Sequence, residues 1–286
     1  MEIAIDVPTE CDGDTDMSAA RQARRNAGAP WRRGVLSALH RPAVIAALAL
    51  SVGSAALADD CPPLRESRIP PSPGPTDQID PVNINWIKAQ LTNYKAGNYD
   101  YDIAAVLADA RVYVERRMKQ SVTKPAVVLD IDETSLSNWP NLKADDFGFF
   151  LDVDCKSSQL PCGFNNWVMM GAAPAIQPTL EFFNYLVSEK ISVFFITGRR
   201  ESQRAKTEEN LALEKFKGWT RLVIRPDDDH ASSIVPFKSG EREKIEKEGY
   251  TILANIGDQR SDLEGNASGT HSECGFKVPN PFYFIP

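Results

Sequence analysis

The feature that most constrains the fold is an alternation of short apolar runs with helical patterns in the second half of the chain. Apolar runs of strand length occur at 126–130, 191–197, 221–224 and 250–256. Between them lie patterns typical of helices of 10–13 residues, at 179–190, 201–213 and 239–248. Strands that are apolar almost throughout are buried on both faces, and helices of this length return the chain to a parallel neighbour. We therefore predict an α/β fold with a doubly wound parallel sheet.

Two more helical patterns precede this region, at about 83–96 and 100–120. Residues 135–175, between the first and second predicted strands, show no such pattern and are rich in aromatic side chains. We expect this segment to be irregular. Residues 59–81 are rich in proline and polar residues, which favours a linker or an extended arm.

Polar residues that could take part in binding or catalysis lie at the ends of the predicted strands. The first strand is followed by Asp130-Ile-Asp132-Glu-Thr134, the second ends in Thr197-Gly198-Arg199, and the last is followed by Gly257-Asp258 and Asp262. Lys238 lies just before the predicted helix that leads into the last strand. Ligands of such sheets bind outside the carboxyl ends of the strands. Four carboxylates, a hydroxyl and an ammonium group are therefore expected at one edge.

Elementary electrostatics indicates what these groups could do together. Clustered carboxylates repel one another unless a cation lies among them, and hard oxygen ligands suit Mg²⁺. Once that charge is neutralised a phosphate can approach, held by Lys238 and by backbone N–H groups of tight loops. A turn after Asp130 can bring Asp130 and Asp132 toward one pocket, where a carboxylate can attack phosphorus and form an aspartyl-phosphate.

Four motifs, in order, resemble those of the haloacid-dehalogenase superfamily. Val127–Thr134 is similar to its D-x-D-x-T motif, Phe195–Arg199 to its second motif, Lys238 to its third and Gly257–Asp262 to its fourth. Three further stretches narrow the resemblance to one group within that superfamily: Leu129 to Pro140, Trp167 to Ile176 and the ending from Pro279 to Pro286. They look like the secreted acid phosphatases of that superfamily, which include the bacterial class C enzymes and the plant vegetative storage proteins. The resemblance covers about 82–286.

The resemblance implies roles for individual residues. Asp130 would be the nucleophile, and Asp132 would protonate the leaving alcohol and then activate water. Thr197, Gly198 and Lys238 would bind the phosphate. The metal ligands would be Asp130, Asp258 and the backbone carbonyl of Asp132, with Asp262 supporting the metal site.

The resemblance also implies that 135–175 is a cap inserted between the first two motifs. Trp139 and Trp167 of this cap are candidates to stack on the alcohol part of the substrate, the alternative being that both belong to the core. The expected function is Mg²⁺-dependent hydrolysis of a small phosphate monoester, such as a nucleotide or a sugar phosphate.

Two rival functions use the same fold. One is a phosphate-binding or storage protein, against which the presence of Asp130 argues. The other is a phosphotransferase that passes the phosphoryl group to an acceptor alcohol. No clear acceptor pocket is visible in the cap sequence.

The N-terminal residues have the pattern of an export signal. Residues 21–41 contain six arginines and no acid, and a 16-residue apolar stretch ending in Ala56-Leu57-Ala58 follows. We predict a leader over 1–58 that is cleaved near Ala58, an arm over 59–81 and a phosphatase domain over 82–286. The alternative is an uncleaved anchor, although the apolar stretch is short for a membrane span. After cleavage we expect a periplasmic or secreted protein without stable membrane association.

The net charge limits the partners of the chain, and its cysteines are compatible with export. The net charge of −7 argues against a nucleic-acid partner, which would require a basic face. Four cysteines follow the predicted leader: Cys61, Cys155, Cys162 and Cys274. In an oxidising compartment Cys155 could pair with Cys162 and Cys61 with Cys274, the alternative being free thiols.

Overall fold

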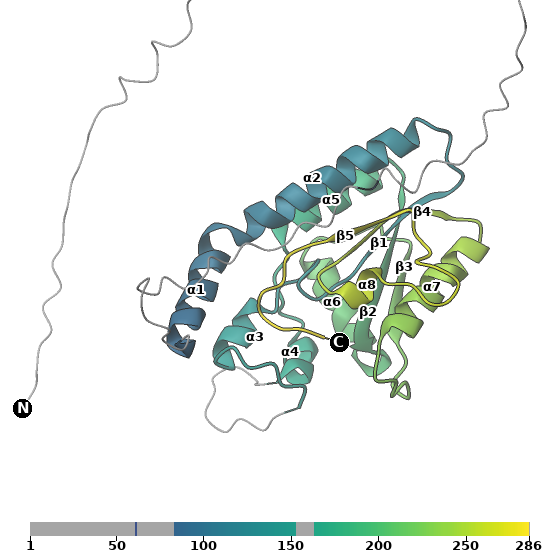
Figure 1. The fold of residues 1–286 in the computed structure, drawn as a ribbon. Helices are drawn as coiled ribbons and strands as arrows, with labels where there is room; N and C mark the ends of the chain where they lie inside the picture. Colours follow the sequence, from purple (N-terminus) through teal and green to yellow (C-terminus); the bar gives the residue numbers. More distant parts are fainter. Residues whose placement is uncertain (1–60, 62–82, 153–162, 286) are drawn as a thin grey trace, which may run out of the picture. The chain divides into compact units, whose positions relative to one another are not determined.

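A five-stranded parallel sheet forms the centre of the protein. The computed structural model describes residue 61 and residues 83–152 and 163–285. The strands are β1 (Pro125–Leu129), β2 (Ser192–Arg200), β3 (Arg221–Arg225), β4 (Thr251–Gly257) and β5 (Cys274–Lys277). Their order in the sheet is β3-β2-β1-β4-β5 (Figure 1). The chain therefore winds outward from β1 in one direction and then in the other, which confirms the predicted doubly wound fold.

Helices cover both faces of this sheet. The longer ones are α1 (Ile84–Gly97), α2 (Tyr99–Met118), α5 (Gln177–Ser188), α6 (Arg204–Leu213) and α7 (Val235–Lys247). The shorter ones are α3 (Trp139–Ala144), α4 (Phe164–Met170), the 3₁₀-helix η2 (Glu201–Gln203) and α8 (Arg260–Leu263). Figure 1 shows α2 and α5 along one side of the sheet and α7 on the other.

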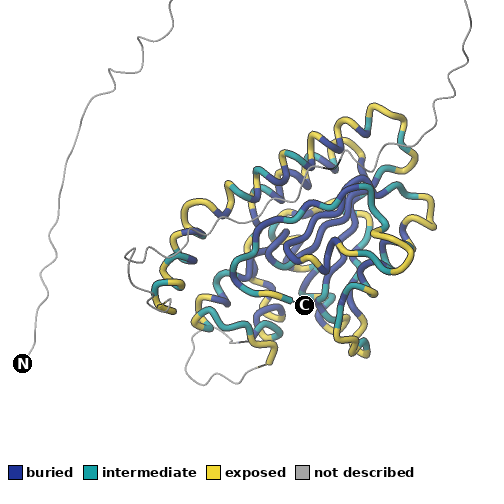
Figure 2. Tube along the Cα trace, in the orientation of Figure 1, coloured by how far each residue is buried: buried dark blue, intermediate teal, exposed yellow. Residues whose placement is uncertain are grey.

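Alternate residues of β1 face opposite layers of helices. Val127 and Leu129 belong to the larger apolar core, which also contains buried residues of α2 and α5. Ala126 and Val128 pack instead with Ile245 of α7 in a smaller core. Because successive side chains of a strand point to opposite faces, a strand covered on both sides must be apolar throughout. Figure 2 shows the strands as the most deeply buried part of the described chain.

Local sequence explains where the first two helices begin and end. The side chain of Asn83 caps α1 by accepting hydrogen bonds from the backbone N–H groups of Asn85 and Trp86. Helix α2 carries two acids in its first turn and Arg116 and Arg117 in its last. This distribution complements the helix dipole.

Helix α7 begins earlier than the sequence indicated. We predicted a start at Ser239, with Lys238 before the helix, whereas the helix starts at Val235 and includes Lys238 in its first turn. Pro236 is tolerated there because the first turn of a helix does not require its N–H. Lys238 is consequently held by the helical backbone and not by a loop.

Several short elements were not predicted. The segment 135–175 was expected to be irregular, but it contains α3 and α4, of 6 and 7 residues. Strand β5 has 4 residues and pairs with β4 from Cys274 onward. Elements this short are stabilised by packing and not by local propensity, so they leave no periodicity in the sequence.

A disulfide joins the beginning and the end of the described chain. Cys61 is bonded to Cys274 on β5, with 5.7 Å between the Cα atoms. This is the second pairing considered from the sequence. Cys155, Cys162, the predicted leader and most of the predicted arm lie outside the described residues. None of the helices in the described ranges combines the length and apolar character needed to cross a membrane.

Candidate active site

A cavity of about 360 Å³ opens at the carboxyl edge of the sheet. Its floor is lined by the polar residues that follow β1, β2 and β4 and by one residue of α7: Asp130, Asp132, Gly198, Lys238, Asp258 and Asp262. Residues from four separate parts of the sequence therefore meet at one place. The four carboxylates and the ammonium group expected at this edge are among them, whereas the hydroxyl of Thr197 is not.

A tight turn after β1 directs two aspartates into this cavity. The backbone N–H of Asp130 still bonds the carbonyl of Ile256 on β4, at 2.9 Å, so Asp130 continues the sheet. The carbonyl of Ile131 then accepts hydrogen bonds from the N–H groups of the residues three to five positions later. Glu133 adopts φ +52°, in the left-handed region. The turn allows Asp130 and Asp132, two positions apart, to line the same cavity.

Lys238 lies between two of the carboxylates. Its Nζ donates to Oδ1 of Asp130 at 2.7 Å and to Oδ1 of Asp262 at 2.5 Å, and all three side chains are buried. Burial by itself would lower the pKa of Lys238, but the charges of Asp130 and Asp262 outweigh burial and raise the pKa above its ordinary value. The lysine is therefore a fixed positive charge at the floor of the cavity.

Three buried carboxylates form a cluster that could hold a metal ion. One oxygen each of Asp130, Asp258 and Asp262 lie within 4.8 Å of one another. Burial, followed by the charge of Asp262, raises the pKa of Asp258 to about 8. When all three carboxylates are ionised, Lys238 leaves two negative charges uncompensated among these four groups. A divalent cation with a preference for oxygen ligands fits this donor set.

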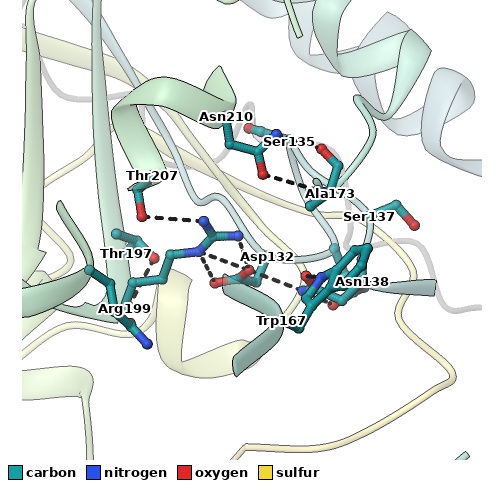
Figure 3. A network of polar contacts seen from close by, with 12 residues as sticks. Asp132, Ser135, Ser137, Asn138, Trp167, Ala173, Thr197, Arg199, Thr207 and Asn210 are labelled. Atoms are coloured by element: carbon teal, nitrogen blue, oxygen red, sulfur yellow. Dashed lines mark hydrogen bonds and ion pairs between the residues drawn. The ribbon is translucent and has the colours of Figure 1, made fainter. Parts of the chain in front are cut away.

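Asp132 lies apart from that cluster. Its carboxylate pairs with the buried guanidinium of Arg199, with Nη2 2.8 Å from Oδ1 (Figure 3). The Nδ2 of Asn138 donates to the same Oδ1 at 3.0 Å. Of the four aspartates predicted around the metal, the structure thus gathers the carboxylates of three and holds that of Asp132 elsewhere. Arg199 and Asn138 had been given no role from the sequence.

The predicted phosphate-binding residues of β2 occupy the end of that strand. Gly198 lines the cavity, whereas Thr197 is fully buried and is not among the lining residues. The hydroxyl of Thr197 accepts a hydrogen bond from the backbone N–H of Arg199 at 3.1 Å. The two residues are therefore close in space to the Asp132–Arg199 pair.

The C-terminal segment 279–285 closes one side of the site. Asn280 Nδ2 donates to Oδ2 of Asp258 at 2.7 Å, and the hydroxyl of Tyr283 donates to Oε2 of Glu133 at 2.6 Å. Burial raises the pKa of Glu133 to about 7, against the opposing effect of the hydrogen bond from Tyr283. The segment thus contacts two motifs far away in sequence. Its residues were part of the resemblance but had been given no role.

Aromatic side chains form the outer wall of the cavity. Phe149 stacks on Tyr283 with 4.4 Å between ring centroids, and Phe164 packs against Phe149. All three rings line the cavity, together with the guanidinium-bearing residues Arg200 and Arg225.

The two tryptophans of segment 135–175 that were candidates for a substrate contact lie elsewhere. Trp167 is buried and its indole N–H donates to Oδ1 of Asn138 at 2.9 Å. Trp139 packs against Phe147 and Phe282. Neither lines the cavity. Both tryptophans lie in or against the apolar core, which is the alternative considered from the sequence, and this placement gives the expected substrate contact no support.

Comparisons with known proteins agree with this geometry. Residues 76–286 match the family described as HAD superfamily, subfamily IIIB (Acid phosphatase). Acid phosphatase 1 of Solanum lycopersicum is 38% identical over 198 residues, which are 68% of this chain and 73% of that protein. Vegetative storage protein 1 of Arabidopsis thaliana is 28% identical over 70% of each chain.

A solved structure shares the fold. The class C acid phosphatase from Bacillus anthracis superposes with a TM-score of 0.53 at 21% identity, covering 69% of this chain and 86% of that one. The family match spans the sheet and segment 135–175, and with them every residue of the cavity floor. The chain accordingly belongs to the acid phosphatases of the haloacid-dehalogenase superfamily, subfamily IIIB, and is a phosphomonoesterase.

Proposed function

We propose that the protein is an exported, Mg²⁺-dependent acid phosphatase that hydrolyses small phosphate monoesters through an aspartyl-phosphate on Asp130. The observation that carries this proposal is the position of Asp130. Its carboxylate is buried at the floor of the cavity, 2.7 Å from Lys238 and within the cluster formed with Asp258 and Asp262. Asp132 follows on the same turn and lines the same cavity.

The reaction proceeds in two steps. In the first, a carboxylate oxygen of Asp130 forms a bond to phosphorus while the bond to the ester oxygen breaks. Asp132 donates a proton to that oxygen, which leaves as the alcohol. In the second step Asp132 takes a proton from water, whose oxygen attacks phosphorus. The bond between phosphorus and Asp130 then breaks, and inorganic phosphate is released.

Side chains around the nucleophile position the phosphate. Lys238 already donates to Asp130 and can donate to a phosphate oxygen at the same place. Thr197 keeps the phosphate-binding role that the resemblance implies, although its buried hydroxyl accepts from the N–H of Arg199 and does not line the cavity. In a loose phosphoryl-transfer transition state, positioning and charge neutralisation account for most of the catalysis.

We assign the metal to Mg²⁺. Asp130, Asp258 and the backbone carbonyl of Asp132 would hold the ion, with Asp262 supporting the site. Bound there, Mg²⁺ would neutralise negative charge on the transferred phosphoryl group. The donor set supports this assignment because it consists of oxygens and carries excess negative charge.

Export is supported by two observations. Residues 1–58 have the composition of a cleaved leader, followed by the arm over 59–81 and the phosphatase domain over 82–286. The disulfide between Cys61 and Cys274 suits an oxidising compartment.

The test compares p-nitrophenyl phosphate hydrolysis by the wild type, by Asp130→Asn and by Asp146→Asn, each with Mg²⁺ and with EDTA. Asp146 is an exposed cap residue paired with Lys88, so it controls for the loss of one carboxylate. We expect Asp130→Asn or EDTA to abolish turnover, while Asp146→Asn keeps it. Mass spectrometry of acid-quenched wild type should locate a phosphoryl group on the peptide containing Asp130. Full activity of Asp130→Asn would disprove the mechanism.

A storage function is the second candidate, because relatives of this chain include vegetative storage proteins. A folded wild type that binds phosphate and releases none from esters would favour it. Transfer of the phosphoryl group to an added alcohol in preference to water would instead indicate a phosphotransferase.

A further inference from the structure

The side-chain amide of Asn138 connects the expected proton donor to the protein interior. Its Nδ2 donates to Asp132 Oδ1 at 3.0 Å and to Glu133 Oε2 at 2.9 Å. Its Oδ1 accepts from the indole N–H of Trp167 at 2.9 Å (Figure 3). An indole nitrogen can only donate, so the amide oxygen must face Trp167 and the NH₂ group must face the two carboxylates. The chemistry of the neighbours therefore determines the orientation of this amide.

Glu133 contacts both the backbone and the side chain of Asn138. Its Oε1 accepts from the backbone N–H of Asn138 at 2.5 Å, and its Oε2 accepts from Asn138 Nδ2 and from the hydroxyl of Tyr283. Glu133 is fully buried and has a positive φ that residues other than glycine rarely adopt. The turn thus directs this carboxylate inward, where it fastens the backbone and the side chain of Asn138.

The contacts of Asp132 distinguish its two oxygens. Oδ1 accepts from Arg199 Nη2 at 2.8 Å, from Arg199 Nε at 3.1 Å and from Asn138 Nδ2. Oδ2 accepts from Arg199 Nε at 3.2 Å. An oxygen surrounded by donors has no room for a proton of its own. A proton on Asp132 is therefore directed to Oδ2.

We propose that Asn138 is a positioning residue that acts with Arg199 to reserve Oδ2 of Asp132 for the proton given to the leaving group. Trp167 and Glu133 hold Asn138 directly, and Tyr283 holds it through Glu133. This inference rests on the proposed function. As the phosphorus–oxygen bond of the ester breaks, the proton moves from Oδ2 to the departing oxygen. The negative charge left on Asp132 is then stabilised by the hydrogen bonds from Arg199 and Asn138. Trp167, initially a candidate substrate contact, acts here through Asn138.

The leaving group provides a readout that separates this role from a merely structural one. p-Nitrophenolate is a stable anion and departs with little help from a proton donor, whereas an alkoxide must be protonated as it leaves. The measured quantity is the ratio of kcat/KM for glycerol 2-phosphate to kcat/KM for p-nitrophenyl phosphate. Loss of folded protein lowers both values equally and leaves the ratio unchanged.

Two variants test different parts of the arrangement. Asn138→Ala removes the hydrogen bond to Asp132, and we expect the ratio to fall by about tenfold, which is part of the roughly 10²–10⁴-fold that a proton donor contributes. Trp167→Phe removes the indole N–H that orients Asn138, and we expect a smaller fall in the same direction, about threefold. Trp219→Phe is the matched control, because Trp219 packs on Phe195 in the core, and it should leave the ratio unchanged.

A double variant shows whether Asn138 acts through Asp132. In the Asp132→Asn background, adding Asn138→Ala should change the ratio less than about twofold, because contacting residues that act as a unit are not additive. A ratio unchanged in both single variants, or a full tenfold fall in the Asp132→Asn background, would overturn the inference. If Asn138→Ala does not fold, Trp167→Phe decides alone. A wild type that hydrolyses neither substrate would disprove the proposed function and this inference together, whereas an active wild type isolates the inference.

Discussion

Lys238 places one positive charge among three buried carboxylates, and this arrangement determines how single residues of the site respond to substitution. Removing one partner of a buried ion pair leaves the other partners uncompensated in a medium that solvates charge poorly. Asp130 and Asp262 both depend on Lys238 in this way. The stability of the site should therefore be sensitive to the lysine and to any cation that replaces its charge.

Lys238→Met should lower the free energy of unfolding by about 3–5 kcal/mol in EDTA. Mg²⁺ should restore part of this loss, because the ion compensates the same carboxylates. Urea unfolding with and without Mg²⁺ measures both effects. The control is Lys244→Met in the same helix, whose exposed pair with Glu241 should contribute less than about 1 kcal/mol. Equal losses in the two variants would contradict the burial argument.

The ion pair between Asp229 and the cavity-lining Arg225 leads to a prediction about pH. Hydrogen bonds from Arg225, at 2.9 and 3.1 Å, lower the pKa of Asp229 to about 2, with a further contribution from the N–H of Ala231. The folded pKa lies below the ordinary value of about 3.9. The contribution of the pair to stability is therefore complete above pH ~4 and is lost as the pH falls toward 2.

Carbon NMR of the Asp229 carboxyl group should show no titration between pH ~6 and ~3. Arg225→Gln should move the midpoint up toward about 3.9, since the hydrogen bonds from the guanidinium are lost. A wild-type midpoint near 4 would show that the pair does not form in solution. If the prediction holds, Arg225 keeps its place on the cavity wall under acidic assay conditions.

At the scale of elements, the close approach of β4 and α8 depends on one glycine. Asp262, in α8, accepts a hydrogen bond from the N–H of Gln259 through Oδ2 while its Oδ1 binds Lys238. A Cβ at Gly257, the last residue of β4, would overlap the side chain of Asp262. The strand end can therefore deliver Asp258 and Asp262 to the same cluster only with glycine at this position.

Gly257→Ala should displace Asp262, lower kcat/KM at least about tenfold and reduce stability by about 1–3 kcal/mol. Gly240→Ala is the matched control, because an added Cβ there meets no heavy atom within 4 Å. Within helix α7 this control should raise stability by about 0.5–1 kcal/mol. Phosphatase assays and thermal unfolding of both variants test the pair. Normal activity of Gly257→Ala would show that the cluster tolerates movement of Asp262.

At the scale of the whole molecule, the described part of the chain is held near both of its ends. The disulfide links Cys61 to Cys274 over a sequence separation of 213 residues. Arg117 at the end of α2 also forms an ion pair with Glu273, next to that cysteine. Beyond β5, segment 279–285 reaches Asp258 and Glu133 at the candidate site. Along the sequence, residues 273 and 274 thus hold the edge of the sheet, and segment 279–285 then contacts the site.

Replacing Cys61 and Cys274 together by serine should lower the free energy of unfolding by about 2–5 kcal/mol, chiefly because the unfolded chain is no longer cross-linked. The contacts of the folded site remain, so kcat should stay unchanged. Urea unfolding of oxidised wild type and of the double variant measures the difference, and a reducing agent should bring the stability of the wild type close to that of the double variant. A loss of kcat in the folded double variant would mean that the disulfide also positions the site.

The alternation of apolar strands with helices determined the sheet, its parallel direction and its double winding. The positions of Asp130, Asp132, Lys238 and Asp258 next to strand or helix ends indicated that they would meet, although their roles stay predictions. These signals are local, because burial on two faces and the chemistry of a strand end are both written in short stretches of sequence.

Only the tertiary structure decided the partners of those residues. Packing between different segments of the chain brings these partners together. It places Asp132 against Arg199 and Asn138, the indole of Trp167 against the amide of Asn138, and Tyr283 against Glu133. Strand β5 and the short helices α3 and α4 likewise exist because neighbours cover them. A hydrogen bond between distant residues requires only one donor and one acceptor, which many side chains offer, so the sequence cannot specify it without the fold.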